Sequence, residues 1–324
     1  MNANESLIAI DLDGGDKAPD VVFRGIRLAI KYGFVKPRQL RGLGLGETVS
    51  RAQRILGNVS CLEAGEKIDM GDPPMEALRR KRSSIHQGLI GVENGEFSAF
   101  VSIGNTAGVM AVALKHLKKL QGKQGDVRPG IAVPLPNATG PCLLLDAGAL
   151  HAVKPESLIN YARMGSIYVE SVWGISRPIV RLVNIGEESC KGDLSLTSAY
   201  SLLSQADDVN FGGNIEPDRI FIEPVTVVVC PGLIGNMIIK TGEGVLNYLG
   251  AKFGPLWKIM SFLHAHHKRM DAKEIGGAIC LGFDGIVIIG HGKSDPMAVA
   301  NAIRRARLEV EANITGKIKE RLLS

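Results

Sequence analysis

Clusters of glycine and small polar residues punctuate this chain, and most of them come directly after a short apolar run. Six such clusters begin at residues 14, 104, 146, 184, 232 and 290. Segments with the helical spacing of apolar residues separate the runs, and this alternation is typical of βα units with a mostly parallel, buried sheet. Because parallel strands end at the same edge of a sheet, we expect the clusters to gather there and to form one ligand-binding cleft.

The apolar runs and their flanking residues indicate where strands and helices lie. We expect strands at residues 7–10, 99–103, 131–135, 142–145, 179–185, 225–230 and 286–289. Ser84 followed by Gln87 makes a capping box for one helix. Pro155 suits the first turn of a second helix, and Asp295 caps a third. The glycine-rich residues 42–46 are interpreted as a turn at the end of a strand.

Composition excludes several classes of protein. Hydrophobic residues make up 45% of the 324 positions, which is enough for a sizeable core. No apolar run approaches the roughly 18 residues of a membrane-spanning helix, and the N-terminus lacks the features of a signal peptide, so we expect a cytoplasmic protein. A net charge of +5 with 5% aromatic residues gives no support for nucleic-acid binding, but it suits anionic substrates or an acidic partner.

The residues that usually bind metals or cofactors are scattered. The five cysteines are never spaced as C-x-x-C, so we expect reduced thiols and neither disulfides nor a zinc site. His264, His266 and His267 form a tract with no acid or cysteine nearby, which we interpret as a solvated or dimer-facing helix. Neither G-x-G-x-x-G nor the P-loop pattern occurs in the glycine clusters. We therefore expect no metal and no cofactor.

The glycine clusters suit an anionic ligand. Glycine lets backbone N–H groups approach a ligand, and the helix that follows directs its positive end toward that ligand. The expected phosphate-binding positions are Gly14, Gly15, Gly104, Thr106, Gly186 and Gly235. Glycine and asparagine are also the ordinary residues of strand-to-helix turns, so any one cluster carries less weight than the set.

Motifs along the chain form an ordered series. The series opens with IAIDLDGGDKAP at residues 8–19, and later members lie at residues 80–84, 101–106, 143–149, 184–188, 210–214 and 291–295. In this order, and over nearly the whole chain, the series resembles that of the phosphate acyltransferases of phospholipid synthesis, the PlsX type. The ordered series is far more specific than any one of its motifs.

The resemblance implies a fold, an assembly and a reaction. The implied fold is α/β, a three-layer α/β/α arrangement with a mostly parallel sheet, similar to isopropylmalate dehydrogenase. It implies a single acyltransferase domain over residues 1–324 with a helical hairpin insertion near 248–275. The implied protein is a homodimer that transfers a fatty acyl group from acyl carrier protein to inorganic phosphate. Its product is an acyl phosphate for phospholipid synthesis.

Candidate catalytic residues follow from the chemistry of that reaction. Phosphate is already a nucleophile, so its attack on a thioester needs positioning more than a covalent enzyme intermediate. The carboxylates that could orient a lysine or take the phosphate proton are Asp11, Asp16 and Asp146. Each of these could equally cap a helix or bind loop backbone. The candidates for stabilising the thioester oxyanion are Asn105 or Asn236, with Lys191 or Lys240.

Two surfaces are candidates for contact with partners. The basic run Arg79, Arg80, Lys81 and Arg82 coincides with one motif of the series and could dock the acidic carrier protein, although basic residues are more often simply solvated. Residues 248–270 are apolar on one side with interspersed basic residues. This segment suits either peripheral contact with the inner face of a membrane or a dimer interface.

Several positions depart from the usual pattern of the resembled family. Pro231 and Ile234 stand where the family usually has an aspartate and a threonine, and Leu150 stands where it usually has an asparagine. Proline can neither act as an acid nor donate a backbone hydrogen bond. The first alternative is therefore a catalytically impaired relative that binds acyl carrier protein or phosphate as a scaffold or regulator. The others are a short-chain acyl-CoA:phosphate transferase and, least favoured, a dehydrogenase.

Overall fold

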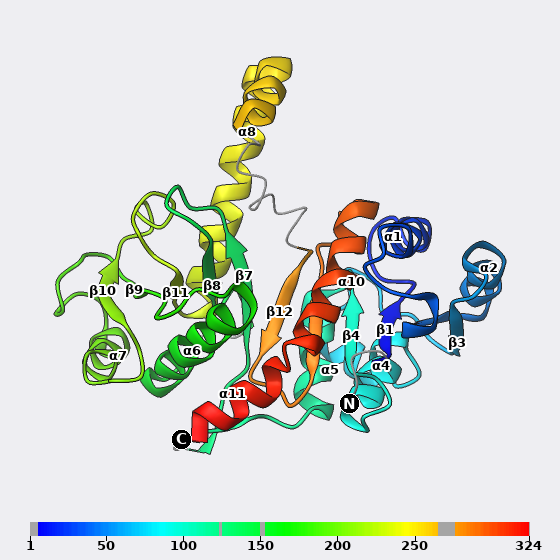
Figure 1. The fold of residues 1–324 in the computed structure, drawn as a ribbon, viewed down its shortest axis with the longest axis horizontal. Coiled ribbons are helices and arrows are strands. Elements are labelled where there is room, and N and C mark those ends of the chain that lie inside the picture. The colour runs from blue at the N-terminus through cyan, green and yellow to red at the C-terminus, as the bar shows by residue number, and fades with distance from the viewer. Residues whose placement is uncertain (1–5, 123–124, 150–152, 265–275, 324) are drawn as a thin grey trace. The chain divides into compact units, whose positions relative to one another are not determined.

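The computed structural model describes residues 6–122, 125–149, 153–264 and 276–323. The chain divides into two compact units (Figure 1). Unit 1 comprises Met1–Pro129 and Lys273–Ser324, and unit 2 comprises Gly130–Ala272. Leu150 and residues 265–275, and with them His266 and His267, lie outside the described residues.

Unit 1 is built on strands that lie in the order β12-β13-β4-β1-β2-β3. Neighbours in this order are parallel, except that β12 runs antiparallel to β13. The strands are β1 (Ile8–Asp11), β2 (Leu40–Leu45), β3 (Ser60–Ala64), β4 (Ala99–Ser102), β12 (Ala278–Leu281) and β13 (Ile286–Ile289). The helices are η1 (Pro37–Gln39), α1 (Asp20–Lys31), α2 (Gly46–Leu56), α3 (Pro74–Arg79), α4 (Ser84–Glu93), α5 (Thr106–His116), α10 (Pro296–Glu311) and α11 (Ile314–Leu323). A separate small hairpin consists of β5 (Gln121–Gly122) and β6 (Gly125–Asp126).

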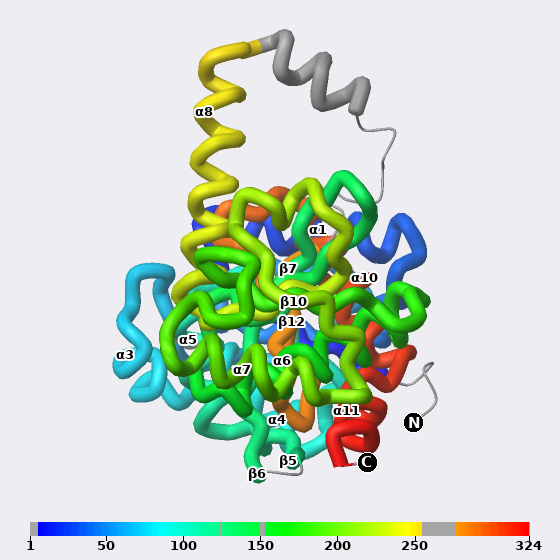
Figure 2. Tube along the Cα trace, turned by 90° about the vertical axis from the view of Figure 1, so that its left-hand side faces the viewer, coloured from blue at the N-terminus to red at the C-terminus, as the bar shows by residue number. Residues whose placement is uncertain are grey.

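Helices cover both faces of the unit 1 strands. α10 packs on β13, β4 and β1, and α1 packs on α10 where Gly25 lies against Val299. α4 packs on β1, β2 and β4, with Gly88 against the ring of Phe100. α5 and α10 lie on opposite sides of these strands (Figure 2). Unit 1 therefore has a helix layer, a strand layer and a second helix layer.

Unit 2 has its strands in the order β10-β9-β11-β8-β7. Neighbours are again parallel, except that β7 runs antiparallel to β8. The strands are β7 (Gly130–Leu135), β8 (Cys142–Leu145), β9 (Val180–Val183), β10 (Phe211–Ile215) and β11 (Val227–Val229). The helices are α6 (Pro155–Tyr168), η2 (Val169–Trp173), α7 (Leu194–Ser204) and α8 (Gly232–His264).

The two faces of the unit 2 strands bury alternate residues. Val227 lies against Gly165 of α6, whereas the next residue, Val228, belongs to the same buried cluster as Ile238 of α8. Because successive side chains of a strand point to opposite faces, α6 and α8 cover opposite faces. The expected α/β fold, with three layers and mostly parallel strands, is thus confirmed within each unit.

α8 consists of two helical segments joined by a kink, and it projects beyond the strands of unit 2 (Figures 1 and 2). Gly254 interrupts it with a φ of 48° and a ψ of −126°. Residues 248–264 of the expected hairpin insertion lie in this helix, and the remainder falls outside the described residues. The apolar side chains of Val245, Leu246 and Tyr248 are exposed. None of the helices in the described segments combines the length and the apolar character needed to cross a membrane.

Most of the local predictions are confirmed. Each expected strand range overlaps an observed strand. Pro155 occupies the first turn of α6, and Asp295 caps α10 by accepting a hydrogen bond from the N–H of Ala298 at 2.9 Å. The sequence pattern does not predict β3 and β10, because β3 exposes most of its side chains and β10 contains two glycines.

The interpretation of residues 42–46 as a turn is wrong. Most of this segment belongs to β2, which lies between β1 and β3. A Cβ on Gly42 would lie 2.8 Å from Sγ of Cys61 and 2.9 Å from Cδ1 of Leu12, so a larger residue would displace these side chains. Glycine in this strand marks a close approach of neighbouring residues and not a change of chain direction.

The expected capping box at Ser84 is wrong by one residue. Ser83 is the N-cap of α4, and its Oγ accepts a hydrogen bond from the N–H of His86 at 3.4 Å. Gln87 donates to the carbonyl oxygen of Glu63 at 3.1 Å instead of closing a box. Ser84 is therefore a helix residue, and its hydroxyl is available for a different partner.

Gly88→Ala tests the packing of α4 on the unit 1 strands. Alanine normally stabilises a helix over glycine by about 0.5–1 kcal/mol. A Cβ at residue 88 would collide with the ring of Phe100, so we expect the free energy of unfolding to fall by about 1–3 kcal/mol, as in other overpacked cores. Gly244→Ala in α8 is the matched control and should stabilise, because a Cβ there meets nothing within 4 Å. Urea denaturation measures both variants, and equal effects would contradict the packing described.

Candidate active site

Three of the glycine clusters meet at one edge of the unit 1 strands. They follow β1, β4 and β13, which are parallel neighbours. A Cβ on Gly14 would lie 2.8 Å from the backbone nitrogen of Gly104, so these two turns touch. The N–H of Asp16 donates to the carbonyl oxygen of Gly292 at 2.9 Å, which joins the third cluster. The predicted gathering is therefore confirmed for these three clusters.

Several backbone N–H groups at this edge form no hydrogen bond within the described residues. In the described part of unit 1, the N–H groups of Gly14, Gly15 and Gly292 have no hydrogen-bond partner. Thr106 is the first residue of α5, where a helix leaves N–H groups without intrahelical acceptors. Proteins bind phosphate with such amides at glycine turns and helix N-termini. We call this set of loops, residues 14–16, 104–106 and 290–292, the unit 1 nest.

Asp11 lies against the nest and is almost completely buried, with 2% of its surface exposed. Its Oδ1 accepts a hydrogen bond from Oγ of Ser84 at 2.8 Å, and its Oδ2 accepts one from Oγ of Ser102 at 2.7 Å. Burial raises the pKa of Asp11, and the bonds from the two serines act in the opposite direction. A carboxylate bonded at both oxygens inside the protein is suited to holding the backbone in place.

The two other aspartates of this motif have different surroundings. Asp13 accepts hydrogen bonds from the N–H of Leu45 and the hydroxyl of Thr48, both at 2.6 Å, so it fastens its loop to β2 and α2. Asp16 is exposed, and a Cβ on Gly292 would lie 3.4 Å from its Oδ1. Asp16 is therefore the carboxylate of this motif that a bound ligand can reach.

Asn105 uses both ends of its side-chain amide within the fold. Its Oδ1 accepts a hydrogen bond from the N–H of Gly108 at 2.9 Å and so caps α5. Its Nδ2 donates at 2.7–3.2 Å to three carbonyl oxygens of one loop, those of Asp69, Met70 and Asp72. These contacts tie the loop to α5, and a role toward an oxyanion stays a prediction.

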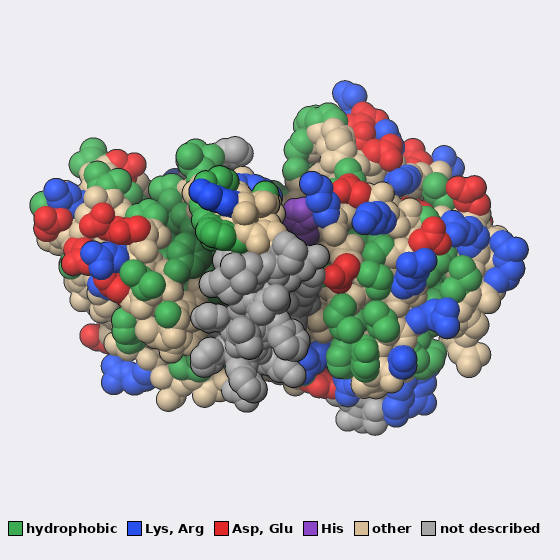
Figure 3. All heavy atoms as spheres, turned by 90° about the horizontal axis from the view of Figure 1, so that it is seen from above, with side chains coloured by type: hydrophobic (Ala, Val, Ile, Leu, Met, Phe, Trp, Pro, Cys, Tyr) green, Lys and Arg blue, Asp and Glu red, His purple; other side chains and the backbone are tan. Residues whose placement is uncertain are grey.

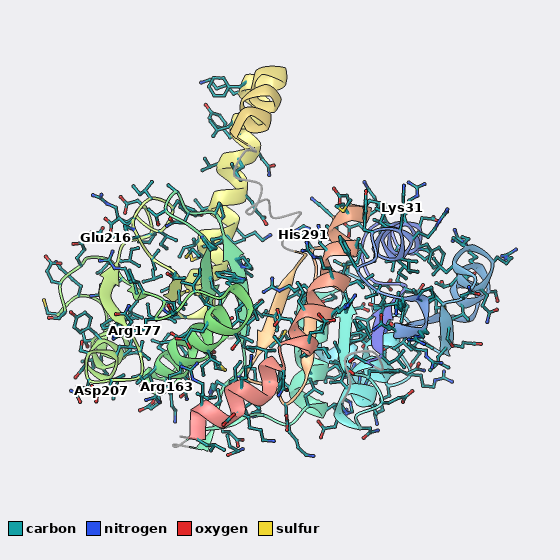
Figure 4. The ribbon with its side chains drawn as sticks, in the orientation of Figure 1. Lys31, Arg163, Arg177, Asp207, Glu216 and His291 are labelled. Carbon is teal, nitrogen blue, oxygen red and sulfur yellow. The ribbon has the colours of Figure 1, made fainter. Side chains whose placement is uncertain are left out.

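Positively charged and titratable side chains lie beside the nest. His291 is exposed in unit 1 (Figure 4), and its Nδ1 accepts a hydrogen bond from the N–H of Lys293 at 3.1 Å. Lys17 and Lys293 are exposed as well. Figure 3 shows a histidine side chain at the surface of unit 1 with Lys or Arg side chains beside it. Such groups favour the approach of an anion.

Two clusters of unit 2 follow β8 and β11, which are also parallel neighbours. Asp146 is fully buried, and its Oδ1 accepts hydrogen bonds at 2.9–3.0 Å from the N–H groups of Ile131, Gly148 and Ala149. Gly235 of α8 has no room for a side chain, because a Cβ there would collide with the carbonyl oxygen of Asp146. The structure therefore brings together Asp146 and the first turn of α8.

Asn236 and both candidate lysines are exposed in unit 2. The side chain of Asn236 has no hydrogen-bond partner among the residues whose placement is described. Lys240 pairs with Glu243 at 2.9 Å, and Lys191 pairs with Glu188 at 3.9 Å. Exposed pairs of this kind contribute about 0–1 kcal/mol, so either lysine can turn toward a ligand at little cost.

Gly186 lies in the loop that follows β9, the neighbour of β11. This loop folds on itself, because Nδ2 of Asn184 donates to the carbonyl oxygen of Lys191 at 2.9 Å. A Cβ on Gly186 would lie 2.9 Å from Oε2 of Glu188. Phosphate binding by Gly186 stays a prediction.

The four residues of the expected docking run differ in their surroundings. Arg80 donates to the carbonyl oxygen of Lys67 and forms ion pairs of 3.4–3.6 Å with three carboxylates, those of Asp69, Asp72 and Glu76. Arg80 therefore stabilises its own loop. Arg79 and Arg82 have side chains that are 74% and 77% exposed, and Lys81 is exposed too. Docking by these residues stays a prediction.

Ser84 and Ser102 are the residues of this site that the sequence prediction misses. Ser102 is the last residue of β4, and Ser84 is the first residue of α4. The available signal is a serine that continues the buried apolar run of β4, since a buried hydroxyl there needs a polar partner. The sequence does not say that this partner is Asp11.

The fold is that of an α/β protein with unpartnered backbone N–H groups at one strand edge of unit 1, and comparison with known proteins shows its family. A model of the family described as fatty acid synthesis protein matches residues 7–317, and the chain belongs to this family. The phosphate acyltransferase of Halothermothrix orenii is 37% identical, with 97% of this chain and 98% of the relative covered. The phosphate acyltransferase of Desulfitobacterium hafniense is 39% identical, with 97% of each chain covered.

Solved structures support the fold. EutD phosphotransacetylase from Staphylococcus aureus matches with a TM-score of 0.59 and 14% identity, covering 95% of each chain. A 4-hydroxythreonine-4-phosphate dehydrogenase from Burkholderia phymatum matches with a TM-score of 0.50 and 13% identity, covering 94% of this chain and 98% of the other. At these identities the likeness concerns the fold alone, and a dehydrogenase among the neighbours agrees with the expected fold class.

The substitution Asn105→Asp keeps the cap that this residue provides for α5 and removes its hydrogen bonds to the loop. Aspartate caps helices as well as asparagine does, but it offers no N–H to the three loop carbonyls. We expect the free energy of unfolding at pH 7 to fall by about 0.5–1.5 kcal/mol for each partly buried hydrogen bond that is lost.

Asp193→Asn is the matched control for this substitution. Asp193 caps α7 by accepting a hydrogen bond from the N–H of Leu196 at 2.9 Å, so this exchange should change stability by less than about 0.5 kcal/mol. Urea denaturation measures both variants. Equal stabilities of Asn105→Asp and the wild type would show that the loop does not depend on Asn105.

Proposed function

We propose that this chain is a phosphate acyltransferase, which transfers an acyl group from a thioester to inorganic phosphate and releases an acyl phosphate. The observation that carries the proposal is the unit 1 nest, whose unpartnered N–H groups suit phosphate. The support comes from relatives named phosphate acyltransferase, which are 37–39% identical over nearly the whole chain.

The reaction needs a held nucleophile more than a reactive side chain. A phosphate oxygen attacks the thioester carbonyl carbon, so a C–O bond forms and the C–S bond breaks. The electron pair goes to sulfur, and the thiolate takes up the proton that hydrogen phosphate loses. Because phosphate is a competent nucleophile, holding and orienting it supply most of the rate.

We assign the proton transfer to Asp16. It is the exposed carboxylate of its motif, whereas Asp11 accepts hydrogen bonds inside the protein at both oxygens. A proton acceptor has to lie within hydrogen-bond reach of the group that loses the proton. Lys17 and Lys293 would offset the charge that Asp16 and phosphate bring to the nest.

Within unit 2, a part for Asn236, with Lys240 or Lys191, toward the thioester oxyanion stays a prediction. The exposed amide of Asn236 can donate to a developing negative charge. The amide of Asn105 already donates to loop carbonyls. Gly235 would keep Asn236 in place, because it packs directly on the backbone of Asp146.

The acyl donor that we propose is a long-chain fatty acyl group on acyl carrier protein. Arg79, Lys81 and Arg82 are exposed and would steer an acidic carrier to the protein. We propose that residues 1–324 act as one acyltransferase domain in the cytoplasm.

A hydroxylamine trap tests this function. The protein is incubated with phosphate and palmitoyl acyl carrier protein, and hydroxylamine then converts any acyl phosphate to a hydroxamate. We expect hydroxamate above the background without phosphate or without protein, because only acyl transfer to phosphate supplies the activated acyl group. Carrier binding without hydroxamate would favour the scaffold alternative, to which Pro231 and Ile234 point. Higher rates with acetyl-CoA or butyryl-CoA would favour a short-chain transferase.

Two glycine variants place the reaction at the unit 1 nest. Gly14→Ala puts a Cβ against Oδ2 of Asp11 and displaces the nest, so we expect the rate to fall by about a hundredfold. Gly71→Ala is the matched control, because a Cβ there meets nothing within 4 Å. Equal rates for the two variants would place phosphate somewhere else.

The exposed apolar side chains of α8 are proposed to contact a second copy of the chain in a homodimer, with peripheral membrane contact as the alternative. We expect the double substitution of Leu246 and Tyr248 by glutamate to convert a dimer to a monomer, because it places charges in an apolar interface. Asn247→Glu is the matched control, since Asn247 is exposed and polar already. Sedimentation velocity measures the assembly. Loss of liposome co-sedimentation with the dimer intact would favour the membrane.

A further inference from the structure

Three side chains from separate elements of unit 1 form a buried hydrogen-bonded group. Asp11 ends β1, Ser84 begins α4 and Ser102 ends β4. Their exposed fractions are 2%, 3% and 1%. Both serine hydroxyls donate to the carboxylate, at 2.8 and 2.7 Å. A carboxylate removed from water persists in a fold only where such donors replace the water.

This group continues into the backbone of the unit 1 nest. The N–H of Gly104 donates to Oγ of Ser102 at 3.0 Å, so this hydroxyl accepts from one loop while it donates to Asp11. The N–H of Asp13 donates to Oδ1 of Asp11 at 3.2 Å. The loops that follow β1 and β4 are therefore joined through one carboxylate.

Gly14 shows how closely these two loops approach. A Cβ on Gly14 would collide with Oδ2 of Asp11 and would lie 2.8 Å from the backbone nitrogen of Gly104. The backbones touch, and the carboxylate fills the space beside them. A displacement of the carboxylate would therefore change the spacing of the amides in both loops.

We propose that Ser84 and Ser102 are positioning residues for phosphate. By fixing the carboxylate of Asp11, they set the spacing between the amides of residues 14–15 and those of residues 105–106, and they do so without touching the substrate. The inference rests on the proposed function, which supplies phosphate as the ligand. It gives Asp11 a positioning part in place of proton transfer.

Ser102 makes one more hydrogen bond than Ser84, so the two alanine variants should change the KM for phosphate by different amounts. Ser102→Ala removes a donor to Asp11 and also the acceptor for the N–H of Gly104, whereas Ser84→Ala removes one donor. We expect the KM for phosphate to rise about tenfold or more in Ser102→Ala and a few-fold in Ser84→Ala. The KM for the acyl donor should stay within about twofold in both. Ser102→Thr keeps the hydroxyl and should restore most of the phosphate affinity.

Two other serines serve as matched controls. Ser83 adjoins Ser84 and caps α4, so Ser83→Ala should lower the melting temperature without changing the KM for phosphate. Ser166 of α6 carries a buried hydroxyl with no partner in the described structure, so Ser166→Ala tests the loss of a buried hydroxyl as such. A merely structural role for Ser84 and Ser102 would lower the melting temperature and leave the ratio of the two KM values unchanged.

The rise in melting temperature with added inorganic phosphate gives a second readout that needs no turnover. We expect phosphate to stabilise the wild type and the Ser83→Ala variant, and to stabilise Ser102→Ala far less at the same concentration. A wild type that forms acyl phosphate and is stabilised by phosphate, with Ser84→Ala and Ser102→Ala behaving like Ser83→Ala, would overturn the positioning role alone. A wild type that does neither would overturn the proposed function, and the positioning role with it.

Discussion

The buried carboxylate of Asp11 is the constraint on which the unit 1 nest depends. Removing a carboxylate from water costs several kcal/mol unless donors inside the protein replace the lost hydration. Here the hydroxyls of Ser84 and Ser102 and the N–H of Asp13 supply those donors. Because the donors come from different elements, satisfying the carboxylate also fixes where β1, β4 and α4 meet. Gly14 is then required, since no side chain fits between Asp11 and the neighbouring turn.

Unit 2 repeats this arrangement with different residues. Asp146 follows β8 and accepts three backbone hydrogen bonds at one oxygen, and Gly235 lets the first turn of α8 pack on its carbonyl group. In both units, a buried aspartate at the end of a strand holds the loop that follows, and a glycine permits the approach of a second segment. Within each unit, the parallel strands place the loops that follow them at one edge, which is where α/β proteins bind their ligands.

Local patterns in the sequence were sufficient for the parts of the fold that depend on neighbouring residues. Most of the buried strands appear as apolar runs, although β12 was not expected, and the cap at Asp295 appears as a short-range motif. β2 could not be predicted, because its glycines are explained by Leu12 and Cys61, which lie in other elements. The part played by Ser84 is set by Asp11, which lies 73 positions away in the chain. A single sequence contains no record of such distant pairs.

We propose that the amides of the unit 1 nest bind inorganic phosphate in a geometry fixed by Asp11. A crystal structure of the protein grown with inorganic phosphate tests this proposal. We expect phosphate density within hydrogen-bond distance of the N–H groups of Gly14 and Gly15 and of the first turn of α5. An empty nest at a phosphate concentration that saturates the enzyme, or phosphate bound only elsewhere, would contradict it.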